Sequence, residues 1–526
     1  MQGRKELTPK MLYQVHLQDL IPEQNFYRLL DKAIDFHFLY KATAQYYGEQ
    51  GQESIDPVVF FKICLVGYLN NINSDRRLIE YCSNCLDVRL FVRYDIDEAL
   101  PWHSTISRTR QLYGEEVFMT LFKKVLSLCI EKGMVRGKRQ AVDSAFNKAN
   151  ASMDSLVEKE VLEDADYYAE ELNENSEYKV SQTRKKLVEQ HHDWKTEAYK
   201  TMPKSNTKGD KMDENGNLIR PKYLSNHTHY SPTDPDARVS VKPGKARQLN
   251  YFGQLAVDDE HHVITGACAD FADKRDSQCL EQIVELTKEN LNENNIELGE
   301  VLADAGYSSG EALKYLDENN IDAWIPNFGQ YKPEREGFVY EKETDKYICQ
   351  QGKELPFRKE AITPRGDSYK IYRSSRKDCN DCPLRTSCIG KSREKTLRDT
   401  VHKPLYDNMH QKLTRNEQYA KRMVKVRSKT VEPVLGTLIN FTNMKRVNTR
   451  GIANANKHVL MAALTYNLKK YLKFITQKPK SQAGVVATME GKVQTSLKTI
   501  FYAFKNTFLR LLIFTKPNFI PKPSVA

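Results

Sequence analysis

The sequence lacks any uninterrupted apolar run of about 18 residues, the length that a membrane-spanning helix needs. Its apolar segment at residues 500–514 is interrupted by Lys505 and Arg510. The first residues are polar and basic, whereas a secretory signal peptide has an apolar centre. These two absences predict a soluble protein of the cytoplasm that contacts no membrane.

Acidic residues are scarce near the end of the chain. Overall, 80 Lys and Arg stand against 69 Asp and Glu, which gives a net charge of +11. Residues 401–475 hold 15 Lys and Arg but only three acids, and residues 476–526 hold eight against one. Such a basic region indicates a polyanionic partner, with nucleic acid as the first candidate. A solvated basic face is the alternative explanation.

Cysteine is spread thinly along the chain except in one cluster. A reducing compartment disfavours a disulfide framework among the ten cysteines. Four of them contain a Cys-x2-Cys-x5-Cys pattern, and these are Cys349, Cys379, Cys382 and Cys388. This spacing predicts a closed, tetrahedral, structural Zn2+ site, with free thiols as the alternative. Cys82 and Cys85 have no second pair nearby and are interpreted as part of a helical core.

The first part of the chain is predicted to be helical. At 526 residues the chain is long enough for two to four structural units. An apolar helix begins at Pro57, a second helix begins at Ser74, and residues 101–113 predict another that carries Arg108 and Arg110. A series of short helices, the last of which carries hydroxyl and guanidinium side chains, is typical of a helix-turn-helix-like DNA-binding domain. A plain helical bundle with a basic surface has the same pattern.

Alternating and short apolar segments predict a mixed sheet after this region. The predicted strands are residues 139–148, 251–258, 262–269, 301–303 and 321–326, and the predicted helices between them are residues 276–291 and 310–318. Three antiparallel strands followed by parallel strands that alternate with helices form the order of a ribonuclease-H-like α/β core. The highly charged residues 153–199 predict a helical insertion after the first strand.

Three acidic residues are candidates for one catalytic site. Asp143 lies on the first predicted strand, and Asp304 follows a buried strand at the edge where open α/β sheets place their sites. Glu432 is almost the only acid in a strongly basic stretch, and Pro433 predicts that it lies near the amino end of a new helix. Carboxylates gathered without a basic partner favour divalent cations, so this set predicts two Mg2+ ions, for which Mn2+ can substitute, and phosphoryl transfer on DNA. Taken singly, Asp304 suits a turn, and Glu432 suits a helix cap or an ion pair with Arg427.

Several short motifs occur in one specific order. They are Ile55–Tyr113 as a helical region, Ala141-Val-Asp-Ser-Ala, Asp234-Pro-Asp-Ala, Ala303-Asp-Ala-Gly-Tyr, the cysteine pattern, Val431-Glu-Pro-Val-Leu-Gly, Arg450-Gly and Tyr466-Asn-Leu-Lys-Lys. Together they resemble a DDE transposase of the bacterial IS1182 insertion-sequence family, which is IS4/IS5-like, over about residues 8–475. The chain departs from the family at Ile439-Asn440, where Lys is expected, and at Leu435, where Phe is usual.

The resemblance implies a domain layout, a site and partners. The implied parts are a helical DNA-binding domain at residues 1–135, a ribonuclease-H-like catalytic domain at 136–475 with a helical insert at about 150–230 and a cysteine-rich insert at about 335–400, and a basic tail at 476–526. Asp143, Asp304 and Glu432 take the DDE roles as Mg2+ ligands. The implied partners are the terminal inverted repeats of an insertion sequence, target DNA and a second copy of the chain, so that the protein is nucleoid-associated when bound to DNA. The predicted DNA contacts are Arg108, Arg110, Arg427, Lys429, Lys445, Arg446 and Arg450.

Two other functions remain open at this point. An inactive, transposase-derived DNA-binding protein would bind DNA without cutting it, and its acids would be structural. A nonspecific nuclease of the same fold would cut DNA that carries no terminal repeats.

Overall fold

The computed structural model describes residues 16–48, 54–158, 226, 229–240, 246–327, 329, 331, 333–362 and 368–476. The chain divides into two compact units, Met1–Tyr471 and Leu472–Ala526. None of the helices in the described ranges is long and apolar enough to cross a membrane. Most of the predicted helical insertion and all of the chain after residue 476 lie outside the described residues.

The described N-terminal region is helical, as predicted. Its elements are α1 (Leu17–Leu20), α2 (Phe26–Ala33), α3 (Phe38–Thr43), η1 (Ala44–Tyr46), α4 (Pro57–Leu69), α5 (Asp75–Asn84), α6 (Leu86–Val92), α7 (His103–Leu112) and α8 (Glu115–Glu131). Asp56 caps α4 by accepting hydrogen bonds from the backbone N–H groups of Val58 and Val59. Nearly every residue of α4 is buried, so the other helices pack around it. Cys82 lies in the core, as expected, and burial raises the pKa of its thiol to about 12.

A mixed sheet follows the helices. Its strands are β1 (Arg139–Lys148), β4 (Arg238–Ser240), β5 (Gln248–Asp258), β6 (Ile264–Phe271), β7 (Glu300–Leu302) and β8 (Asp322–Trp324). The order is β4-β5-β1-β7-β8, and β6 also pairs with β5. The pairs β1–β5 and β5–β6 are antiparallel, whereas β1–β7 and β7–β8 are parallel. This arrangement agrees with the predicted strand order of a ribonuclease-H-like core. A separate two-stranded pair, β2 (Val157–Glu158) with β3 (His229–Tyr230), follows η2 (Met153–Ser155).

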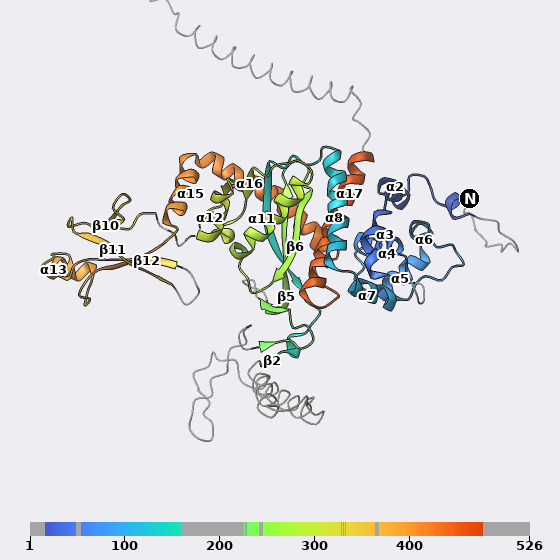
Figure 1. The fold of residues 1–526 in the computed structure, drawn as a ribbon, viewed down its shortest axis with the longest axis horizontal. Helices are drawn as coiled ribbons and strands as arrows, with labels where there is room; N and C mark the ends of the chain where they lie inside the picture. The colour runs from blue at the N-terminus through green and yellow to red at the C-terminus, as the bar shows by residue number, and fades with distance from the viewer. Residues whose placement is uncertain are drawn as a thin grey trace, which may run out of the picture. The chain divides into compact units, whose positions relative to one another are not determined.

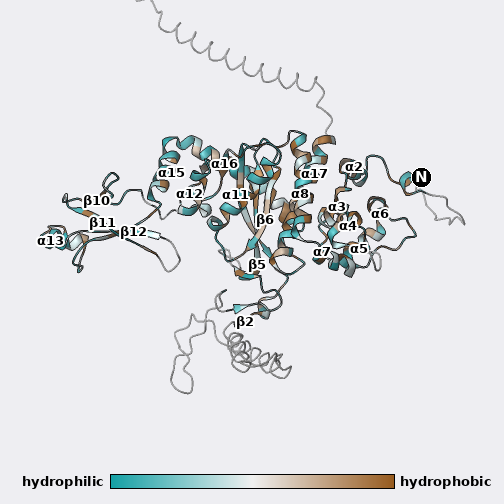
Figure 2. Cartoon of the chain, in the orientation of Figure 1, coloured by the Kyte–Doolittle hydropathy of each residue, from teal (hydrophilic) through white to brown (hydrophobic). Residues whose placement is uncertain are grey.

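Helices cover both faces of the sheet (Figure 1). The helices are α11 (Asp276–Asn292) and α12 (Gly310–Glu318) on one face and α17 (Ile452–Thr476) on the other. Gly266 faces α11, because a methyl group there would collide with Thr287. Gly253 faces the opposite way, toward Met444 and Val459. Apolar residues gather on the central strands and on α8 and α17 (Figure 2), so the sheet is the middle layer of three.

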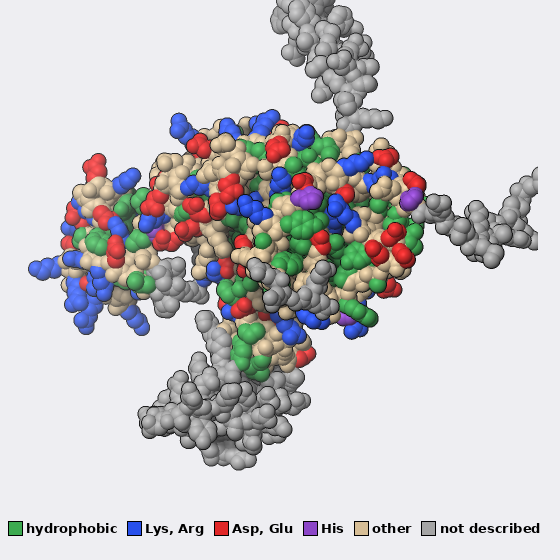
Figure 3. All heavy atoms as spheres, turned by 45° about the vertical axis from the view of Figure 1, so that its right-hand side comes forward, with side chains coloured by type: hydrophobic (Ala, Val, Ile, Leu, Met, Phe, Trp, Pro, Cys, Tyr) green, Lys and Arg blue, Asp and Glu red, His purple; other side chains and the backbone are tan. Residues whose placement is uncertain are grey.

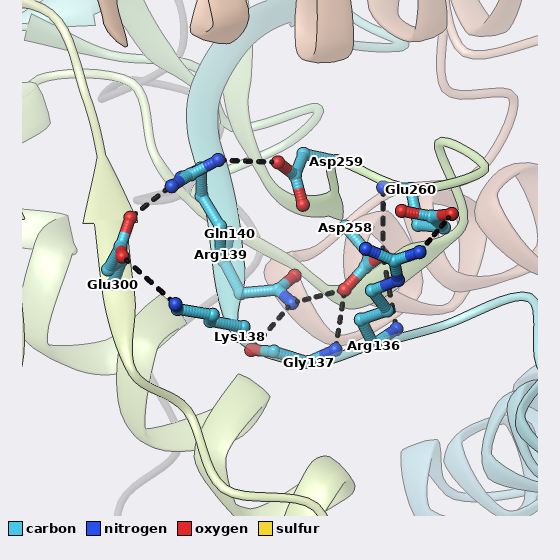
Figure 4. Close-up of polar contacts among 9 residues, drawn as sticks. All are labelled: Arg136, Gly137, Lys138, Arg139, Gln140, Asp258, Asp259, Glu260 and Glu300. Carbon is cyan, nitrogen blue, oxygen red and sulfur yellow. Dashed lines mark hydrogen bonds and ion pairs between the residues drawn. The ribbon is translucent and has the colours of Figure 1, made fainter. Parts of the chain in front are cut away.

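The start of β1 is fixed to β7 by a polar network (Figure 4). Arg139 pairs in register with Glu300, and its Nε lies 2.7 Å from the Glu300 carboxylate. The carboxylate of Asp258 is fully buried and accepts hydrogen bonds from the Gly137 N–H at 2.7 Å and from Gln140 Nε2 at 3.0 Å. Because a strand can slip only by whole residues, these contacts set which residues of β1 and β7 lie opposite one another.

Replacing Glu300 by Ala is expected to lower the free energy of unfolding by about 1.5–3 kcal/mol, the usual cost of losing a hydrogen bond to a charged group. Both side chains are mostly buried, with 20% and 13% exposed, so water screens the pair little. Urea unfolding measures the loss. The matched control is Glu318→Ala, since Glu318 pairs with Lys314 at the surface and should contribute less than about 0.5 kcal/mol. Equal losses in the two variants would contradict this role of Glu300.

A second sheet forms a cysteine-containing lobe. Its elements are β9 (Phe338–Glu341), β10 (Lys346–Cys349), β11 (Glu354–Ile362), β12 (Ser368–Arg373), α13 (Arg376–Asn380), α14 (Arg385–Cys388) and β13 (Thr396–Thr400). The lobe has a small core, which comprises Tyr347, Leu355, Tyr372 and Leu397. Its outer end carries many Lys and Arg side chains in Figure 3. An apolar core this small gives the lobe little stability of its own.

Two helices return from the lobe to the main sheet. They are α15 (Lys403–Arg415) and α16 (Glu417–Phe441), separated by Asn416, whose side chain caps α16 through the Tyr419 N–H. The prediction that a helix begins at Pro433 is wrong, because α16 continues through it as one helix. A proline inside a helix removes one backbone hydrogen bond. The burial of neighbouring residues of α16, including Val434 and Leu438, stabilises the helix despite this loss.

Candidate active site

Asp143 is held by an arginine from a distant helix. It lies on β1 with its side chain 17% exposed, and Arg427 Nη1 of α16 lies 2.9 Å from its Oδ2. Burial is the largest influence on this carboxyl and raises its pKa. The Ser144 N–H and Arg427 act in the opposite direction, whereas the charge of Asp304 raises the pKa further. Burial therefore disfavours the charged form of Asp143, and the nearby guanidinium of Arg427 partly offsets this effect.

Asp304 occupies the matching place on the next strand. The β1–β7 register pairs Ala141 with Leu302, and each strand carries its acid two residues later. Asp304 directly follows β7 and begins η3 (Ala305–Tyr307), where its side chain accepts a hydrogen bond from the Gly306 N–H at 2.8 Å. Side chains two residues apart on a strand point to the same face. Asp304 thus lies just beyond the carboxyl end of β7, next to Asp143 in the middle of β1.

Glu432 approaches the site through the same arginine. Arg427 Nη2 donates to Glu432 Oε1 at 3.1 Å, while Nη1 holds Asp143. The predicted location of Glu432 at a helix amino end is wrong, because α16 begins at Glu417 and Glu432 lies in its interior. Its side chain is 55% exposed. One guanidinium therefore bridges a strand acid and a helix acid that lie far apart in the sequence.

A fourth acid, Asp276, stands beside this group and was not among the sequence candidates. It is the first residue of α11 and accepts a short hydrogen bond from Ser144 Oγ. A methyl group on Gly306 would lie 3.0 Å from an oxygen of Asp304 and 3.1 Å from one of Asp276, so both carboxylates flank this glycine. Burial and the nearby negative charges, with Asp276 first among them, raise the pKa of Tyr307 well above its usual value. In the sequence, Asp276 follows Lys274 and Arg275 at the start of a predicted helix, where an acid is normally interpreted as part of a helix cap. No sequence pattern therefore marked Asp276 as a member of this group.

The donor set fits a hard divalent cation in chemistry, although the triad is not gathered around one point. Asp143, Asp304 and Glu432 offer carboxylate oxygens, the ligands that Mg2+ prefers. The positive charge of Arg427 between two of them shows that this place favours a cation. In the described part of the chain, however, no three His, Cys, Asp or Glu side chains lie close enough to hold one metal ion. Glu432 is turned to Arg427 in this arrangement.

The Asp143→Asn variant is expected to be more stable than the wild type at pH 7 in metal-free buffer. Because folding raises the pKa of Asp143 above its usual value of 3.8, the folded state binds more protons than the unfolded state between the two values. Stability is therefore lost as the pH rises through that window, and the penalty is fully present at neutral pH. Thermal unfolding at several pH values should show an advantage of Asp143→Asn that shrinks from pH 7 toward pH 4. Exposed Asp317 supplies the control, since Asp317→Asn should show no such trend.

The four clustered cysteines line one small cavity. Cys349, Cys379, Cys382 and Cys388 surround a space of about 30 Å3 together with Lys353, Arg385 and Lys395. All four are free thiols and half-buried. Their side chains do not form a metal-ligand group among the described residues. The donor chemistry fits Zn2+, which four cysteine thiolates can hold. Four thiolates carry more negative charge than one Zn2+ ion neutralises, and the neighbouring Lys353, Arg385 and Lys395 would offset the excess.

The predicted DNA contacts occupy different environments. Arg108 is exposed on α7, and Lys429, Lys445, Arg446 and Arg450 are exposed as well. Arg110 is buried, and its guanidinium bonds both oxygens of Asp75 at 3.0 and 2.8 Å. Arg110 thus joins α7 to α5, a location that does not suit a phosphate contact. The guanidinium of Arg427 faces the acids instead of the surface.

Comparison with known families gives two matches. A transposase domain of the DUF772 type matches residues 15–112, and a transposase DDE domain matches residues 348–472. The second span contains Glu432 and the four clustered cysteines, whereas Asp143 and Asp304 precede it. No curated protein matches the chain. The chain therefore contains two segments that match transposase domains, and the second of them, a DDE domain, characterises a family of phosphoryl-transfer enzymes.

Proposed function

We propose that this transposase cleaves DNA at the terminal inverted repeats of an insertion sequence and transfers the freed 3′-hydroxyl ends to target DNA. One observation supports this proposal most directly. Asp143 and Asp304 each lie two residues beyond the paired residues Ala141 and Leu302 of neighbouring parallel strands, and one arginine joins Asp143 to Glu432. The IS1182 insertion-sequence family is the proposed source, and a dimer or larger assembly would hold the paired ends.

Asp143, Asp304 and Glu432 are the proposed metal ligands, and Asp276 lies beside them. When bound, two Mg2+ ions would supply positive charge at the attacked phosphate and a lowered pKa for the attacking water or 3′-hydroxyl. The register of β1 and β7 keeps the two strand carboxylates at a fixed spacing. Arg427 offsets part of the negative charge of Asp143 and Glu432, and with cations bound at these carboxylates its guanidinium would be available for a DNA phosphate.

Removing Arg427 should destabilise the metal-free protein. An Arg427→Met variant leaves the mostly buried Asp143 without its counter-charge, which should lower the free energy of unfolding by about 2–3 kcal/mol, somewhat less than for a fully buried pair. Addition of Mg2+ should recover part of this loss in urea unfolding. The control is Lys421→Met on the same helix, because Lys421 forms an exposed pair with Glu417. A loss of stability that Mg2+ leaves unchanged would argue against competition between the arginine and the metal.

We also propose that the four clustered cysteines hold a structural Zn2+ ion. Support comes from their convergence on one cavity and from the small apolar core of the lobe. A site with four thiolates leaves no open position for water, so the ion would stabilise the lobe and take no part in DNA cleavage.

The test of the proposed function is a cleavage and strand-transfer assay. The substrates are a duplex that carries the DNA sequence flanking this gene and a duplex of the same composition in scrambled order. Nicks at the element ends that need Mg2+, followed by joining to a target duplex, are the expected result. Equal cutting of both duplexes would favour a nonspecific nuclease. Specific binding without any cutting would favour the inactive DNA-binding protein.

A further inference from the structure

Two segments far apart in the sequence are joined by the side chain of Asn443. One is residues 70–74, which link α4 to α5, and the other is residues 442–450, which link α16 to α17. The Asn443 amide donates to the backbone carbonyls of Gly67 at 3.0 Å and Ile72 at 2.9 Å. The N-terminal helices are thus bonded to the segment that directly follows the helix of Glu432.

Further asparagines complete this junction, and we call Asn71, Asn73, Asn443 and Asn448 the asparagine clasp. The Asn443 N–H donates to Asn71 Oδ1 at 2.9 Å. Asn73 donates to the Arg446 carbonyl at 3.0 Å, and Asn448 donates to the Asn73 carbonyl at 3.2 Å. Asn71 and Asn443 have φ values of 56° and 61°, a left-handed conformation that asparagine tolerates better than most residues. These contacts fix the two backbone segments side by side.

The end of β1 joins the same junction. The Lys148 N–H donates to the Lys445 carbonyl at 3.0 Å, and the Val447 N–H donates to the Lys148 carbonyl at 2.9 Å. Asn150 adds a bond from its amide to the Asn448 carbonyl at 3.0 Å. The strand that carries Asp143 therefore ends against the segment that the clasp holds.

Exposed cations occur on the joined segments and on the first turn of α5, which directly follows one of them. They are Arg76, Arg77, Lys148, Lys445 and Arg446, and we call them the clasp surface. Within the described ranges, none of their side chains forms an ion pair with a carboxylate. The nearest acid on α5, Asp75, is already neutralised by Arg110. Unpaired cations on a fixed backbone keep their full charge for an outside partner.

We propose that the clasp surface is a single binding site for the phosphate backbone of duplex DNA, built jointly by the N-terminal helices and the catalytic domain. The proposal rests on the proposed function, and it adds Arg76, Arg77 and Lys148 to the DNA contacts. A phosphate backbone is favoured over an acidic peptide because the cations follow rigid segments and the neighbouring asparagines are already engaged with the protein backbone. DNA binding draws its affinity from such contacts.

The experiment measures DNA affinity against salt concentration with the full chain and the duplex of the flanking sequence. The variants are Arg76→Ala with Arg77→Ala and, separately, Lys445→Ala with Arg446→Ala. A matched control, Lys124→Ala with Lys132→Ala, removes two exposed cations, one on α8 and one directly after it. Each clasp variant should reduce the slope of log affinity against log salt by about 2, one for each lost phosphate contact, and the control should leave it unchanged.

The outcomes separate this inference from the proposed function. If the wild type cuts the element ends while the clasp variants keep its salt slope, the clasp surface is refuted and the transposase activity stands. If the wild type binds DNA without cutting, the salt slopes still decide the role of the clasp surface. If the wild type does not bind the duplex, both proposals fail. Circular dichroism of each variant excludes a loss of fold, which these exposed substitutions should not cause.

Discussion

Replacing Asp304 by asparagine is expected to lower DNA strand cleavage by about 10³-fold or more while DNA binding is retained. The variant keeps the hydrogen bond from the Gly306 N–H, because an amide oxygen can accept it as the carboxylate does. It loses the negative charge, which we propose holds a divalent cation. A loss of about 4 kcal/mol of transition-state stabilisation corresponds to roughly 10³ in rate. Single-turnover cleavage of a prebound terminal duplex measures the effect without a contribution from binding.

The same assay tests the other two members of the triad. Asp143→Asn and Glu432→Gln should show losses of similar size, since the three acids are proposed to act as one unit. The control is Asp317→Asn, which alters an exposed acid of α12 away from the carboxyl edge of the strands. If Glu432→Gln cleaves as well as the wild type, the third acid has been assigned to the wrong residue. Glu417 would be the next candidate, although it lies at the exposed start of α16, paired with Lys421.

The second large effect is expected in the cysteine-containing lobe. The free-energy change from losing the proposed zinc site should exceed the loss of about 4 kcal/mol expected for cleavage by Asp304→Asn. The purified protein is expected to contain one Zn2+ ion per chain, and Cys382→Ser should release it. Binding of structural zinc contributes on the order of 10 kcal/mol to folding in small domains, while the lobe has only four buried apolar residues in its core. Hydrogen exchange of β10–β13 should therefore lose its protection, while β1 and β5 keep theirs. Metal analysis and exchange mass spectrometry check both parts.

A second cysteine provides the comparison for this result. Cys85 lies between α5 and α6, half-buried and outside the cluster. Cys85→Ser should keep the metal content and the protection of the lobe unchanged. A wild-type protein that contains no zinc after expression in zinc-supplemented medium would leave the cluster as free thiols.

Local rules of the sequence predicted the elements of the catalytic domain well. The alternation in residues 139–148 and the apolar run before Asp304 correspond to β1 and β7, because each pattern is enforced by the burial of one or both faces of a strand. The register between these strands was not predictable, since it depends on the pairing of Arg139 with Glu300 across 161 positions of the chain. That pairing determines whether the two acids meet.

Other features were hidden because tertiary contacts overrode a local preference. Pro433 normally marks a helix start, yet packing of α16 against the sheet continues the helix through it. Arg110 follows the polar pattern of an exposed DNA reader, although it is buried with Asp75. The asparagine clasp suggests only turns in the sequence, because asparagine is common in turns and its partners lie 369 or more residues away.

The bridge made by Arg427 also has a consequence for the protein during its synthesis. Asp143 emerges from the ribosome about 290 residues before Glu432, an interval of roughly 15–60 s at usual rates of translation. A nascent or truncated chain that ends before α16 has α5, α7 and both strand acids but neither Arg427 nor Glu432. Such a fragment has no means of completing the proposed nuclease. If the proposed assignment holds, the late position of α16 confines DNA cutting to chains that have been translated past Glu432.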